Sequence, residues 1–96
     1  MKELKIVATI IVKEEFKEEL LPVFHQVVDE TRKEEGNISY ELHQDVNNPL
    51  KFIFLEVWKS QEAIDSHNIS AHFRAFAKAI RKKTDALTID VMEKIY

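Results

Sequence analysis

LKIVATIIV, the segment from Leu4 to Val12, is rich in isoleucine and valine, which fit the pleated surface of a buried β-strand. Successive side chains of a strand point to opposite faces, and here both faces are apolar. One face carries Leu4, Ile6, Ala8, Ile10 and Val12, and the other carries Val7 and Ile11. This strand therefore needs a covering layer on each side.

The residues that follow change to the period of a helix. From Glu14 onward an apolar stripe recurs at three- and four-residue steps, at Phe16, Leu20, Phe24, Val27, Val28 and Thr31. We expect Pro22 to kink this helix or delay its start, because proline lacks an amide donor and clashes with the preceding turn. Gly36 should close the helix, since glycine adopts positive φ freely.

Two alternating segments come next, residues 38–45 and 52–58, and Asn47, Asn48 and Pro49 supply turn residues between them. We expect an antiparallel hairpin. One face of the first strand holds Ile38, Tyr40, Leu42 and Gln44, and one face of the second holds Phe52, Phe54, Glu56 and Trp58. The opposite face of the second strand is also apolar, with Ile53, Leu55 and Val57.

Two serines predict the helices that complete the chain. Ser60 can cap a short helix that ends at His67, and Ser70 can cap a longer helix that carries Phe73 on its apolar stripe. Residues 87–95 alternate as a last strand. The order β-α-β-β-α-α-β predicts one α+β domain over residues 1–96, with a ferredoxin-like fold whose helices lie on one side of an antiparallel sheet.

This fold leaves one sheet face uncovered. Three helices can bury only one face, yet at least two strands are apolar on both, and soluble proteins rarely expose such a contiguous patch. A second copy stacked sheet to sheet would bury it. We therefore predict a homodimer held together through its sheet faces.

The composition excludes several classes of protein. The absence of cysteine excludes disulfides and thiolate metal sites, and a single glycine excludes glycine-rich phosphate loops. With 17 acidic and 14 basic side chains the formal charge is −3, so nucleic acid is not an expected partner. The apolar N-terminal stretch is too short to span a membrane, and we expect a soluble cytoplasmic protein.

The four histidines do not predict a metal centre. His67 and His72 are five positions apart with a helix break expected between them, and no carboxylate lies at a helpful offset. We therefore expect no bound metal and no cofactor. His25 should be a partly exposed helix residue. His43 shares a strand face with Glu41 and Asp45, which is typical of a solvated face but also compatible with a catalytic pair.

His67 and Glu56 are the candidate catalytic residues. His67 closes a short helix, where an imidazole can point into a cavity beneath Phe73 and exchange a proton, or simply be a satisfied structural histidine. Glu56 lies between Phe54 and Trp58 on an apolar face, so it is either a structural hydrogen-bond acceptor or a catalytic acid or base. Trp58 and Tyr40 suit an aromatic ligand and an ordinary core equally.

Four segments in series resemble the antibiotic biosynthesis monooxygenase domain family. They are EGNISY at 35–40, FLEVWKS at 54–60, EAIDSH at 62–67 and SAHF at 70–73, and the resemblance covers nearly the whole chain. It implies a dimeric α+β barrel with a pocket between sheet and helices in each subunit. The family's pocket histidine falls on His67, and its Glu-x-Trp pair falls on Glu56 and Trp58. Less directly supported pocket neighbours are Tyr40, His43, His72 and Phe73.

Members of this family include cofactor-independent monooxygenases that oxidise quinols and polyphenols, haem-degrading enzymes, and an isomerase of a phosphorylated quorum-sensing signal. The haem ligand position falls on Ala77 and the first strand lacks asparagine, which disfavours haem degradation. The resemblance thus implies a monooxygenase acting on a small electron-rich aromatic substrate. His67 or Glu56 would take a phenolic proton, Trp58 and Phe73 would stack on the ring, and Tyr40 or His72 would orient a ring oxygen. The alternatives are a small-carbonyl isomerase and a non-catalytic ligand-binding dimer.

Overall fold

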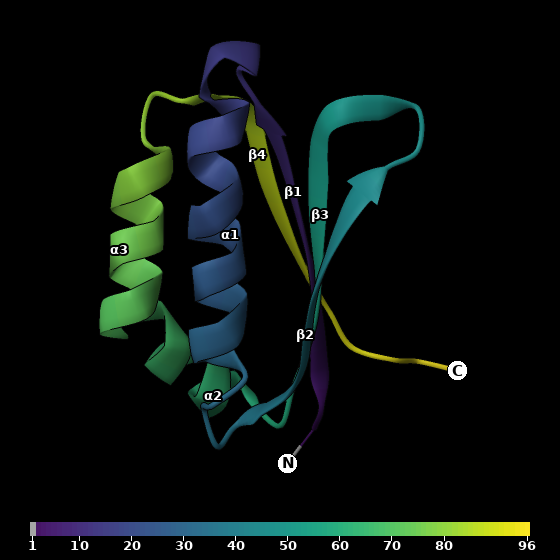
Figure 1. Cartoon of the computed structure of the whole chain (residues 1–96). Coiled ribbons are helices and arrows are strands. Elements are labelled where there is room, and N and C mark those ends of the chain that lie inside the picture. The colour runs from purple at the N-terminus through teal and green to yellow at the C-terminus, as the bar shows by residue number, and fades with distance from the viewer. Residues whose placement is uncertain (1) are drawn as a thin grey trace.

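The segment Leu4–Val12 forms an inner strand of a four-stranded antiparallel sheet in a computed structural model, which describes residues 2–96 (Figure 1). The elements in chain order are β1 (Leu4–Val12), a 3-10 turn (Glu14–Phe16), α1 (Lys17–Thr31), β2 (Asn37–Asp45), β3 (Asn48–Trp58), α2 (Gln61–Asn68), α3 (Ala71–Ile80) and β4 (Thr84–Met92). The strand order in the sheet is β2-β3-β1-β4. This is the predicted α+β ferredoxin-like fold.

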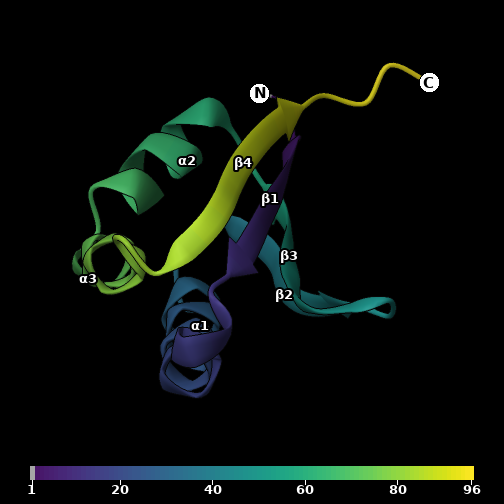
Figure 2. The same cartoon turned by 90° about the horizontal axis from the view of Figure 1, so that it is seen from above.

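All three α-helices lie on one side of the sheet (Figure 2). The core between the two layers is apolar and aromatic, and Phe24 of α1 packs edge-on against Phe52 and Phe54 of β3. The strand register brings the helix-side residues together, because Glu56 of β3 pairs with Ile6 of β1 and with Tyr40 of β2. Glu56 therefore faces the core from the centre of the sheet.

Gly36 has a different role from the one predicted, and Pro22 lies within the helix. The helix begins late, at Lys17, but Pro22 then lies inside α1. The helix ends at Thr31, before Gly36, and the φ of Gly36 is not positive. A Cβ at Gly36 would lie 2.4 Å from the Cβ of Ala63, so glycine is required here for a close approach to α2.

Two strand boundaries also differ from the sequence pattern. β4 covers Thr84–Met92 instead of residues 87–95, because the turn at Lys82 has positive φ and returns the chain to the sheet early. Ile38 does not share the buried face of Tyr40, since the register shifts between Asn37 and Ser39 and leaves Ile38 exposed. A local irregularity of this kind interrupts the period of two.

The sheet face away from the helices is uncovered and apolar at its centre. It carries Val7 and Ile11 of β1 beside Ile53, Leu55 and Val57 of β3, all of them half-buried or exposed. We call these five residues the outer sheet face. Among the residues described, no helix combines the length and the apolar character that a membrane crossing requires.

Candidate active site

Glu56 is a buried carboxyl in the middle of β3, with only 6% of its surface exposed. The side chains of residues two apart on a strand point to the same face, so Trp58 lies next to it. The Trp58 Nε1–H donates to Glu56 Oε1 at 2.9 Å. Burial raises the pKa of Glu56 to about 7, the Trp58 hydrogen bond opposes that rise, and the charge of Glu34 adds to it.

His67 is held in the last turn of α2 and is 2% exposed. Ser60 caps the start of α2 by accepting a hydrogen bond from the amide of Ala63 at 3.2 Å. The imidazole is enclosed by aromatic rings, with centroid distances of 4.7 Å to Trp58 and 4.8 Å to Phe73. The position of His67 is thus fixed by its helix cap and by its packing.

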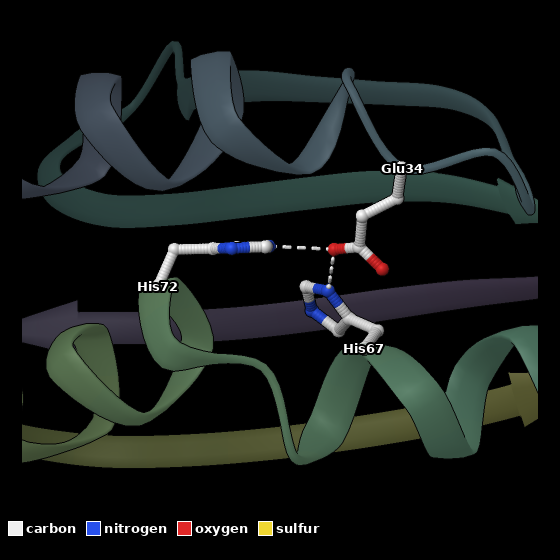
Figure 3. A group of neighbouring side chains, drawn as sticks. All are labelled: Glu34, His67 and His72. Carbon is white, nitrogen blue, oxygen red and sulfur yellow. Dashed lines mark hydrogen bonds and ion pairs between the residues drawn. The ribbon is translucent and has the colours of Figure 1, made fainter.

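A third side chain, that of Glu34, completes this group from the loop after α1 (Figure 3). Its Oε2 lies 2.7 Å from Nδ1 of His67 and 2.6 Å from Nε2 of His72. A carboxylate only accepts hydrogen bonds, so both imidazoles donate an N–H to it. Burial lowers the pKa of His67, and the hydrogen bond and charge of Glu34 oppose that effect.

These contacts prepare His67 to accept a proton. Its Nδ1–H is held by Glu34, which leaves the lone pair of the neutral ring on Nε2. Tyr40 is close to the same group, with its ring 5.7 Å from that of His67. Burial, together with the charge of Glu56, raises the pKa of Tyr40 above its ordinary value, so the phenol keeps its proton and remains a donor.

Four of the predicted site residues line one cavity of about 90 Å³ between the sheet and the helices: Tyr40, Glu56, His67 and Phe73. The rest of its wall is mainly apolar and comes from β1, β3, α3 and β4, with Asn68 of α2 as a polar member. Leu87 and Ile89 of β4 form part of this wall and are 48% and 55% exposed. The exposed Ala77 of α3 lies in the wall as well, so the cavity opens between α3 and β4.

Three other predicted residues lie outside the cavity wall. Trp58 is fully buried behind it, where it contacts Glu56 and His67 instead of offering a free face for stacking. His72 contacts Glu34. His43 is exposed and pairs with Ile53 on the opposite face of the sheet, so it does not line this cavity.

Sequence reasoning missed Glu34. It is 33 positions from His67 and 38 from His72, so no local period connects the three residues. The one sequence signal was its position directly before the EGN segment of residues 35–37, two residues before Gly36. The expectation that no carboxylate accompanies the two histidines is also corrected, because ligand atoms of Glu34, His67 and His72 all lie within 4.8 Å of one another. These are the residues that could hold a metal ion.

Comparisons with known proteins agree with this fold. The sequence model of the family described as "Antibiotic biosynthesis monooxygenase" matches residues 4–79. A Bacillus subtilis protein called "Putative monooxygenase YcnE" is 42% identical over 69 residues, which are 72% of this chain and 73% of that protein. A Synechocystis protein, sll1783, is 32% identical over 95% of this chain, and the chain spans 60% of that protein's length.

Solved structures show the same fold. A conserved protein from Methanosarcina mazei superposes with a TM-score of 0.93 at 31% identity, covering 99% of this chain and 95% of the other. A crystal structure described as an antibiotic biosynthesis monooxygenase superposes with a TM-score of 0.92 at 29% identity, covering 97% and 99% of the two chains.

Proposed function

The chain belongs to the antibiotic biosynthesis monooxygenase family, and on that premise we propose that it oxidises a small electron-rich aromatic compound, such as a quinol or polyphenol, with no cofactor. The observation that carries this proposal is the convergence of His67, Glu56 and Tyr40 on one mainly apolar cavity. Such a substrate can reduce dioxygen itself once it is deprotonated. The protein then needs to supply a base, hydrogen bonds and a dry space.

The first step is removal of a phenolic proton by Nε2 of His67. Glu34 supports this step because its carboxylate accepts the Nδ1–H and stabilises the imidazolium that forms. Tyr40 and the protonated form of Glu56 donate hydrogen bonds to the developing phenolate. An apolar wall strengthens these interactions, since little water competes with them.

The second step forms a bond between dioxygen and a ring carbon next to the oxygen-bearing carbon. The peroxide formed takes the proton from His67, and water is then eliminated as the C–H and O–O bonds break. One oxygen atom stays in the product as a new carbonyl and the other leaves as water. A quinol thus becomes a hydroxyquinone, and the substrate supplies all the electrons that reduce dioxygen.

The size of the cavity restricts the substrate. About 90 Å³ is less than the ~150 Å³ of an engineered cavity that holds benzene, so the enclosed part accommodates at most one ring. Larger ring systems would extend through the opening along Leu87 and Ile89. The cavity wall includes no lysine or arginine among the residues described, which disfavours a phosphorylated substrate and hence the isomerase alternative.

Trp58 acts through Glu56 in this proposal. Its indole N–H stabilises the ionised form of Glu56 and so limits the rise in the pKa of that carboxyl. His72 contacts Glu34 and so acts on His67 indirectly, just as Trp58 acts through Glu56. Of the two residues expected to stack on the substrate ring, only Phe73 lines the cavity, where it can pack against the ring from the helix side.

The working unit in this proposal is a homodimer. The outer sheet face supports this part of the proposal, because its five apolar side chains from two strands remain uncovered. A second copy is the partner that suits this face, because stacking two such faces builds a shared apolar layer of the kind found between packed sheets.

The test is oxygen uptake by the metal-free protein with a panel of hydroquinones. We expect uptake with single-ring quinols and formation of hydroxyquinones, and we expect His67→Ala to lower kcat by roughly 10²–10⁴-fold, the usual contribution of a general base. Glu34→Gln should lower kcat more than tenfold with little change in KM, because the Nδ1 contact loses its charge. His25→Ala is the control, since His25 is exposed on α1.

Four results would contradict the proposal. Absence of uptake with every quinol excludes an oxygenase of this type. Conversion of a carbonyl compound without oxygen consumption would instead indicate the isomerase, and tight ligand binding without turnover would indicate a binding protein. Equal activity of His67→Ala and the wild type would remove His67 from the mechanism.

A further inference from the structure

A hydrogen-bonded group is formed by Glu34, His67 and His72. Only His67 of the three lines the cavity, so a role in the cavity does not explain the whole group. His72 lies outside the cavity wall, yet its imidazole is directed at the same carboxylate oxygen as His67 (Figure 3). We propose that Glu34, His67 and His72 bind a divalent first-row transition-metal ion such as Zn²⁺, through Nδ1 of His67, Nε2 of His72 and the carboxylate of Glu34.

The donor set fits this class of ion. Two imidazoles and one carboxylate are a common ligand set of zinc sites that keep an open position, and of other first-row metals. Mg²⁺ and Ca²⁺ prefer oxygen ligands, so two nitrogen donors disfavour them. Three protein ligands leave a fourth position for water.

The three ligands come from separate elements that are held in place. His67 lies in the last turn of α2 and His72 lies in the first turn of α3. Ser70, between them, donates to the carbonyl of His67 at 2.6 Å and accepts from the amide of Phe73 at 3.2 Å, which fixes the turn. Fixed ligands favour binding because little freedom is lost when the ion enters.

The distances require only a small adjustment. Metal bonds of about 2.0–2.2 Å in a tetrahedral centre place ligand atoms roughly 3.3 Å apart. The carboxylate oxygen now lies 2.7 and 2.6 Å from the two nitrogens. An increase of about 0.6–0.7 Å in these two separations, reached by small side-chain rotations, would make room for the ion.

Charge and access also favour a cation. Glu34 is paired with no lysine or arginine within residues 2–96, so its half-buried carboxylate has only the two imidazoles as partners. The side chain of His67 is 3% exposed, whereas those of Glu34 and His72 are 17% and 20% exposed. An ion and its water can therefore enter from the side of Glu34 and His72, away from the buried His67.

Metal binding would change what His67 presents to the cavity. When Nδ1 coordinates the ion, the ring proton moves to Nε2, so no proton is released overall. Nε2 then donates a hydrogen bond and no longer accepts a proton. This consequence rests on the proposed function, and there it makes the ion an inhibitor of proton abstraction.

The test is titration of the EDTA-treated full chain with Zn²⁺ by calorimetry and with Co²⁺ by visible absorption. We expect one ion per chain and a Co²⁺ spectrum typical of four- or five-coordination. Glu34→Gln and His72→Ala should each weaken binding at least 100-fold, because each removes a direct ligand and loss of an outer-shell partner alone costs 10–100-fold. His25→Ala, on an exposed part of α1, should bind as the wild type does.

Absence of stoichiometric binding, or binding that survives both Glu34→Gln and His72→Ala, would overturn this proposal. Circular dichroism and the melting temperature of each metal-free variant show whether it is folded, and His72→Gln replaces His72→Ala if that variant is not. These readouts need no substrate. Metal binding without oxygen uptake by the metal-free protein would therefore refute only the proposed function, and uptake without metal binding would refute only the metal site.

Discussion

Burial moves the pKa values of Glu56 and His67 in opposite directions. It raises the pKa of the carboxyl to about 7 and lowers that of the imidazole, because in each case burial disfavours the charged form. Near neutral pH the site therefore contains a neutral imidazole that accepts protons and a carboxyl that is about half protonated. A proton acceptor and a proton donor thus coexist in one cavity.

The raised pKa of Glu56 predicts a specific pH dependence of stability. The folded state binds the Glu56 proton more tightly than the unfolded state does, so stability is lost as pH rises from the ordinary value of 4.5 to about 7. Relative to Glu56→Gln, which does not titrate, the wild type should lose about 3 kcal/mol of unfolding free energy across this range. Above pH 7 the difference should level off.

Urea unfolding at a series of pH values, followed through the fluorescence of the single tryptophan, measures this difference. Equal m-values for the two proteins would show that they expose similar surface on unfolding. His67 contributes the opposite slope, because stability from a lowered imidazole pKa is lost as pH falls, but this contribution is common to both proteins and cancels. A pH-independent difference would show that Glu56 is not perturbed.

At the scale of elements, the approach of Gly36 to Ala63 connects the loop before β2 with α2. The missing Cβ lets these two segments touch, with the Cα of Ala63 only 3.3 Å from where a Cβ would lie. This contact matters for the site, because Glu34 lies two residues before Gly36 and His67 lies one turn after Ala63. The same packing therefore holds both partners of the Glu34–His67 contact.

Gly36→Ala should destabilise the protein by about 1–3 kcal/mol, the usual cost of overpacking. Ala63→Gly alone should cost about 1 kcal/mol, since glycine weakens a helix. Because Ala63→Gly removes the clashing Cβ, the double variant should be about as stable as Ala63→Gly alone. Thermal or urea unfolding of the four proteins measures the coupling, and simple additivity of the two single costs would show that the clash is not the cause.

For the molecule as a whole, the outer sheet face is an apolar surface that no element within residues 2–96 covers. Leu55 lies in its middle, opposite Val7 on one neighbouring strand and Glu41 on the other. Leu55→Lys should convert the proposed dimer into a monomer, because two lysines would be buried against each other in a two-fold interface. Sedimentation velocity at micromolar concentration measures this change.

Gln26→Lys adds the same charge on the exposed helix side and should leave the dimer intact. Oxygen uptake by the Leu55→Lys variant would then show whether each cavity works alone. A wild-type protein that sediments as a stable monomer without aggregation would refute the dimer.

The order of elements, and which residues share a face of β1 and of β3, followed from the sequence. Alternation in Leu4–Val12 and the helical stripe around Phe24 are local periods, and local periods need no knowledge of the rest of the chain. The motif resemblance identified His67 and Glu56. The alternation of side chains along β3 placed Glu56 on the same face as Trp58. The boundaries of β4 and the bulge at Ile38 were missed, because they depend on pairing between strands.

The assembly of the site depends on tertiary contacts. Glu34 meets His67 and His72 across 33 and 38 positions, and contacts between such distant residues depend on how helices pack on the sheet, which no local period records. The same packing places Trp58 behind the cavity and His43 on the opposite face. Local hydrophobic periods therefore predicted the helix layer and the sheet layer. The packing of α1, α2 and α3 on one sheet face then determined which polar side chains converge.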